Sequence, residues 1–142
     1  MKHKSIKYFA ICLAVTALPA IFAPAQEQKT PEQKEKELRE NIGKQLDQMT
    51  ENLNLEDWQI FYMDSILVHD YQALSGELEN LQKSGVENLN IYQLTQDKWA
   101  EKIYTAFRKV LNDQQWAKYL KSGAAREKKM RDKRAVMAAS KQ

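Results

Sequence analysis

Residues that interrupt a helix are scarce in this sequence. It has three prolines, of which only Pro31 lies beyond the first 25 residues, and its four glycines are Gly43, Gly76, Gly85 and Gly123. A fold built of several strands needs turn residues at short intervals, and this chain lacks them. The scarcity predicts an all-helical protein.

Cysteine is limited to Cys12. An exported protein of this size often relies on disulfides, which this chain cannot form internally. The fold must therefore be held together by helix packing, by self-association, or by both.

The N-terminal 25 residues have the pattern of a secretory signal peptide. A basic start precedes an apolar stretch over residues 8–22, and Ala23-Pro24-Ala25 gives the small residues that signal peptidase reads. The stretch is shorter than the roughly 20 residues that span a bilayer, so we expect cleavage after Ala25 and no transmembrane anchor in the mature chain. Cys12 follows Ile11, where lipid attachment requires a small residue, so a lipoprotein is not expected.

The charges are divided unevenly along the rest of the chain. Residues 26–116 carry 10 basic and 17 acidic side chains, a balance of −7, whereas residues 117–142 carry 9 and 2, a balance of +7. Opposite blocks of this kind can pair within one molecule or between two copies. Residues 124–142 contain few apolar side chains, and we expect a basic, solvated helix end or a disordered tail there.

Apolar spacing predicts four helices within a domain over residues 26–123. The first begins at the cap Thr30-Pro31, the second runs from about Glu56 to Lys83, the third from Asn90 to Leu111, and the fourth begins at Asn112. Asn90 and Gln93 are predicted to form a capping box for the third helix, and Asn112 and Gln115 one for the fourth.

The first half of the second helix is apolar on nearly every side. The stretch "WQIFYMDSILV" carries a buried-type stripe and, on other sides of the helix, further large side chains, among them Trp58, Phe61, Tyr62 and Ile66. A helix that is apolar all round must be covered by two partners or left partly exposed for a ligand. These four residues are candidate binding residues.

One joint between helices occurs twice. "LNLEDWQ" and "VLNDQQW" both place a leucine four residues before a glutamine at a predicted helix start: Leu55 with Gln59, and Leu111 with Gln115, the latter capped by Asn112. An exported, all-helical protein with such paired elements resembles the LTxxQ-motif family of periplasmic proteins, the Spy/CpxP-like family. Asn112 stands in the threonine position of the second element and Glu56 in that of the first.

The resemblance implies a thin, curved four-helix protomer that forms an antiparallel homodimer in the periplasm. It also implies a holdase-type chaperone that binds unfolded exported proteins without ATP. The apolar residues of the second helix would then contact clients, and the basic side chains Lys128, Lys129 and Arg131 would attract acidic segments. A regulatory adaptor that docks on a sensor protein and a structural helical protein of the envelope remain alternatives, because all three predict the same apolar stripes.

Catalysis, cofactors and metals are not expected. Ser65 and His69 lie four residues apart, but a continuous helix provides neither a strained turn nor an oxyanion hole for a nucleophile. His69 is the only histidine after the signal peptide and has no cysteine to join it as a metal ligand. No phosphate-binding glycine loop occurs, and export makes a nucleic acid partner for the basic tail improbable.

Overall fold

The structure, a computed structural model, describes residues 29–140. The described elements are α1 (Pro31–Leu53), α2 (Asp57–Lys83), α3 (Leu89–Val110), α4 (Asp113–Tyr119), the π-helical turn η1 (Leu120–Ala124) and α5 (Ala125–Ala139). No strand occurs between residues 29 and 140, so the all-α fold with four helices is confirmed, with the fourth divided into α4, η1 and α5. The predicted signal peptide, its cleavage site and Cys12 lie outside the described residues.

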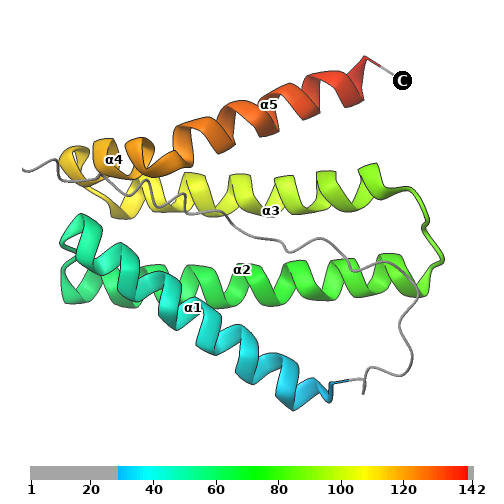
Figure 1. Cartoon of the computed structure of the whole chain (residues 1–142), viewed down its shortest axis with the longest axis horizontal. Helices are drawn as coiled ribbons and strands as arrows, with labels where there is room; N and C mark the ends of the chain where they lie inside the picture. The colour runs from blue at the N-terminus through cyan, green and yellow to red at the C-terminus, as the bar shows by residue number, and fades with distance from the viewer. Residues whose placement is uncertain (1–28, 141–142) are drawn as a thin grey trace, which may run out of the picture.

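The helices form an open fan around a central pair (Figure 1). Helices α2 and α3 run antiparallel along each other, and α1 and α4 meet at the same end of that pair. From this end α1 and α5 diverge on either side of the pair, so their far ends stand apart (Figure 1). The arrangement leaves room between α1 and α5.

The core lies at the end where the four helices meet. It contains the apolar face of α1 from Ile42 onward, the inner face of α2 and the second half of α3, and its buried members are Ile42, Leu46, Met49, Leu53, Leu55, Met63, Leu67, Ile103, Phe107 and Leu111. These residues recur at intervals of three and four within each helix, which places them on one face. The apolar face of α1 is therefore buried from Ile42 onward, and Leu38 at its outer end is only partly covered.

The cap of α1 has the predicted arrangement. The N–H of Gln33 donates to the Thr30 hydroxyl at 3.2 Å, and the Gln33 side-chain oxygen accepts from the Thr30 N–H at 2.9 Å. Pro31 occupies the first helical position, where its missing N–H has no partner to lose.

The predicted cap of α3 was wrong by two residues. Helix α3 begins at Leu89, and the side chain of Asn88 accepts from the N–H of Asn90 at 3.0 Å. Asn90 therefore lies inside the helix, and the Gln93 side chain donates to Asp97 instead of reaching back to a cap. Both asparagines can cap a helix, and the earlier one does so here.

Residues 125–139, expected as a solvated helix end or a disordered tail, form the regular helix α5. The chain kinks before it at Gly123, whose φ of 121° is non-helical. Only glycine adopts such a conformation without strain, so this residue sets the point where α5 turns away from α4.

Candidate functional site

The two repeated joints, far apart in sequence, lie against each other. The side-chain amides of Gln59 and Gln115 form two hydrogen bonds in opposite directions, at 2.7 and 2.9 Å. Both side chains are buried, with 2% and 6% exposure. The pair ties the start of α2 to the start of α4 across 56 residues of sequence.

Each glutamine also serves its own helix start. The side-chain oxygen of Gln59 accepts from the N–H of Glu56, and that of Gln115 accepts from the N–H of Asn112, both at 3.0 Å. Asn112 completes its half of the second box by accepting from the N–H of Gln115 at 2.9 Å. The first joint contains a different bond, because the Glu56 carboxylate accepts from the indole N–H of Trp58 at 2.7 Å.

The leucines of the two joints are buried in the core. Leu55 is 9% exposed and Leu111 is 3% exposed. The Asn54 backbone, in the left-handed conformation with φ 51°, ends α1 and lets the chain turn toward Leu55. The side-chain amides of both glutamines are therefore hydrogen-bonded within the protein, and the joint residues have a structural role.

Three adjacent aromatic residues of α2 form an exposed surface, which we call the aromatic cluster: Trp58, Phe61 and Tyr62. Their exposures are 50%, 69% and 55%. The rings contact one another edge to face, with centroids 6.2 Å apart for Trp58 and Tyr62 and 5.8 Å apart for Phe61 and Tyr62. Aromatic rings at this level of exposure offer a contact area that tolerates many partner sequences.

Ile66, the fourth apolar candidate, differs from the other three. It packs against the core and lines an outer groove between α2 and α3, together with Lys102, Ala106 and Lys109. The structure thus brings Trp58, Phe61 and Tyr62 together on the surface and places Ile66 partly inside.

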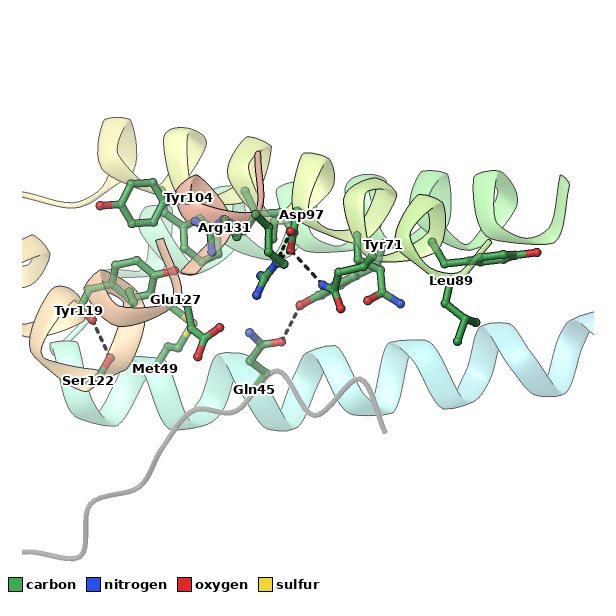
Figure 2. A pocket seen from close by; sticks show the side chains of 18 residues that line it. Gln45, Met49, Tyr71, Leu89, Asp97, Tyr104, Tyr119, Ser122, Glu127 and Arg131 are labelled. Atoms are coloured by element: carbon green, nitrogen blue, oxygen red, sulfur yellow. Dashed lines mark hydrogen bonds and ion pairs between the residues drawn. The ribbon is translucent and has the colours of Figure 1, made fainter. Parts of the chain in front are cut away.

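A second concave feature, which we call the tyrosine cavity, lies between α1 and α5 over the middle of α3 (Figure 2). Its volume is about 470 Å³. Core residues form its apolar floor, and tyrosines form much of its walls. Its lining includes Gln45, Met49, Tyr71, Asp97, Ile103, Tyr104, Phe107, Tyr119, Glu127, Arg131 and Arg134.

Two tyrosines of this cavity, Tyr71 and Tyr119, keep their protons at neutral pH. Burial raises the pKa of Tyr119 to about 12, although the nearby Arg131 opposes the shift. Burial also raises the pKa of Tyr71, partly offset by its hydrogen bond to Gln45. These two side chains are therefore neutral, and the charged side chains of the cavity lining belong to α3 and α5.

The basic candidate residues of α5 do not share one surface. Lys129 is exposed, whereas Lys128 and Arg131 both turn toward Glu101 of α3. The Arg131 side chain is only 10% exposed. Arg131 and Lys128 are thus engaged inside the molecule, which is one of the two ways in which the opposite charge blocks could pair.

The side chains of Ser65 and His69, considered above for catalysis and metal binding, have different partners and are not hydrogen-bonded to each other in the described residues. The Ser65 hydroxyl donates to the Phe61 carbonyl oxygen of the preceding turn at 3.0 Å, and the 73%-exposed His69 pairs with the buried Asp70. Among residues 29–140 no group of three or more histidine, cysteine, aspartate or glutamate side chains could hold a metal ion.

Sequence reasoning missed Asp97 and Glu101, the α3 partners of α5. They are four residues apart, on one face of α3, and Arg131 and Arg134 are three apart on one face of α5. This matched spacing of opposite charges could have predicted that the two helices pair. It did not show which of several acidic pairs the basic residues of α5 would contact.

The part of the chain that the structure describes has no helix long and apolar enough to cross a membrane. The chain matches no family model, no curated protein and no solved structure. The resemblance to the LTxxQ-motif family stays a prediction from the two joints.

Proposed function

We propose that the mature chain is an exported, periplasmic holdase of the Spy/CpxP-like type, which binds unfolded envelope proteins without ATP. The observation that carries the proposal is the aromatic cluster. Three large aromatic side chains, each at least half exposed, are contiguous on one helix face, and monomeric soluble proteins seldom expose contiguous apolar surface without a binding role.

Two further features support the same function. The open fan leaves the tyrosine cavity accessible next to the core, and the paired joints hold the four helix ends together without needing that space to be filled. We also propose that the protein is a homodimer, because a small helical domain without disulfides and with an exposed aromatic surface gains stability by covering it.

The test is the aggregation of a reduced, unfolding client protein with and without the purified chain from Gln26 to Gln142. We expect suppression that weakens when Phe61→Ser and Tyr62→Ser are combined. Val136→Ser is the matched control, because Val136 and Phe61 are both 69% exposed but Val136 lies outside the cluster.

Absence of suppression at several-fold molar excess of the unmodified protein would refute the holdase. Unchanged suppression by the folded double serine variant would show that the binding surface is elsewhere. Circular dichroism of each variant establishes that the helices are intact before the aggregation result is interpreted.

A further inference from the structure

Helix α5 is attached to α3 almost entirely by charged groups. The Arg134 guanidinium donates two hydrogen bonds to the Asp97 carboxylate, at 2.6 and 2.8 Å. Arg131 donates to Glu101 at 3.2 Å and lies with its guanidinium carbon 5.4 Å from the Tyr104 ring centroid. Lys128 adds a third cation, 3.3 Å from Glu101.

No apolar burial supplements these contacts. Helix α5 has no buried residue over its 15 positions, whereas α1 buries four. The ion pairs are partly removed from water, since the Asp97 and Arg134 side chains are 13% and 28% exposed. They therefore contribute more than exposed pairs do, but they weaken as salt rises, unlike a contact between apolar faces.

The connection before α5 is a natural pivot. Gly123 adopts a φ of 121°, and no atom lies within 4 Å of the position that a Cβ would occupy there. A helix that is joined through an unhindered glycine and held beyond it by ion pairs can move away without exposing a buried residue of its own.

The tyrosine cavity lies beside α5, which lines it together with α1 and α3 (Figure 2). The face that α5 presents to the cavity is polar, with Glu127, Arg131 and Arg134 in its lining. The cavity lining also includes Leu89 of α3, which is 70% exposed, and the half-buried Tyr104. A helix that carried apolar side chains beside its basic ones would make the same ion pairs and would also remove this exposed apolar surface from water.

From these contacts we infer that the α3 face formed by Asp97, Glu101 and Tyr104, together with the tyrosine cavity, is a docking surface for cationic amphipathic helices. Helix α5 is its intramolecular occupant and engages the acidic side chains of this surface until a better-fitting helix replaces it. The inference rests on the proposed function only in treating such a helix as part of a client. It reverses the expectation that the basic tail attracts acidic clients, because the most deeply placed basic groups of the tail face the protein itself.

The probe is a fluorescently labelled peptide of residues 124–140, whose binding is followed by anisotropy at low salt. It should bind the chain with Arg131→Glu and Arg134→Glu about tenfold more tightly than the unmodified chain, because the variant's own α5 no longer competes at its high effective concentration. Arg134→Gln, which removes one pair without adding repulsion, should shift binding in the same direction by a smaller factor.

Two controls separate docking from a general effect of charge. Arg126→Glu with Lys129→Glu changes the net charge equally on exposed positions of α5 and should leave peptide binding as in the unmodified chain. Asp97→Asn with Glu101→Gln also frees α5 but removes the docking carboxylates, so it should not bind the peptide.

The shape of the cavity is tested with the peptide itself. Glu127 lines the cavity, whereas Asp132 is exposed, so replacing either by leucine makes the same charge change at two different places. The peptide with Glu127→Leu should bind the protein variant whose α5 carries Arg131→Glu and Arg134→Glu more tightly than the peptide with Asp132→Leu does. Equal binding of these two peptides would overturn the role of the cavity.

The docking surface would be overturned if the peptide bound the variant with Arg131→Glu and Arg134→Glu no more tightly than the control with Arg126→Glu and Lys129→Glu. It would also be overturned if the peptide bound neither of them. Since anisotropy needs no unfolding client, a failed aggregation assay with successful peptide docking would refute the holdase alone.

Discussion

The amide pair between Gln59 and Gln115 gives the sharpest quantitative prediction. Replacing Gln115 by methionine keeps the volume of the side chain but removes both amide bonds to Gln59 and the acceptor for the Asn112 N–H. Each buried polar group left without a partner costs about 1–3 kcal/mol. We expect Gln115→Met to lower the free energy of unfolding by about 3 kcal/mol, which is at least about 12 °C in melting temperature for a domain of this size.

Gln59→Met should cost a similar amount, because it orphans the Glu56 N–H, the Val110 carbonyl and the partner amide. The double variant loses the amide pair only once, so its cost should be about 4 kcal/mol and not the roughly 6 kcal/mol of simple addition. The resulting coupling of about 2 kcal/mol lies within the range measured for residues that contact each other.

Urea unfolding followed by far-ultraviolet circular dichroism measures all four members of this cycle. Gln114→Met is the matched control, since Gln114 is the exposed neighbour of Gln115, and its effect should stay within about 0.5 kcal/mol. Additivity of the two single variants within about 0.5 kcal/mol would show that the amides do not depend on each other and would refute the reasoning.

The remaining predictions concern processing, assembly, capping and the pivot. Mass spectrometry of protein from its native envelope should find Gln26 at the N-terminus, and an uncleaved chain would contradict the signal peptide. Light scattering at tens of micromolar should give the mass of a homodimer, and a monomer mass would contradict the proposed assembly. Asn112→Ala removes a cap bond and should cost about 1 kcal/mol in a urea titration, whereas no measurable loss would argue against the box. Gly123→Ala should destabilise by about 1 kcal/mol or more because of its positive φ, while Gly43→Ala, inside α1 with open space around it, should stabilise by about 0.5–1 kcal/mol; melting shifts of the same sign would refute this contrast.

The helices themselves were predictable from the sequence because helix signals are local. A cap such as Thr30 and a leucine stripe such as that of α1 depend on residues three and four positions apart, which meet on any helix whatever surrounds it. The same locality explains the error at α3, where Asn88 and Asn90 are chemically equivalent caps.

Periodicity also found the apolar residues of α2, but it did not show which of them would be covered. Trp58, Phe61 and Tyr62 point away from the core and Ile66 points toward α3, a distinction that depends on where α3 lies. One sequence pattern was thus compatible with both outcomes, since a helix that is apolar all round has no face marked for solvent.

Only the tertiary structure brought distant polar groups together. Gln59 meets Gln115 and Arg134 meets Asp97 because α2 and α3 fold back along each other and α5 turns at Gly123. The sequence determined the existence of α1 to α4 and the face that α1 buries, since those depend on the spacing of neighbouring residues. The angles at which α1 and α5 leave the central pair, and with them the tyrosine cavity, result from the packing of whole helix ends, which no local spacing encodes.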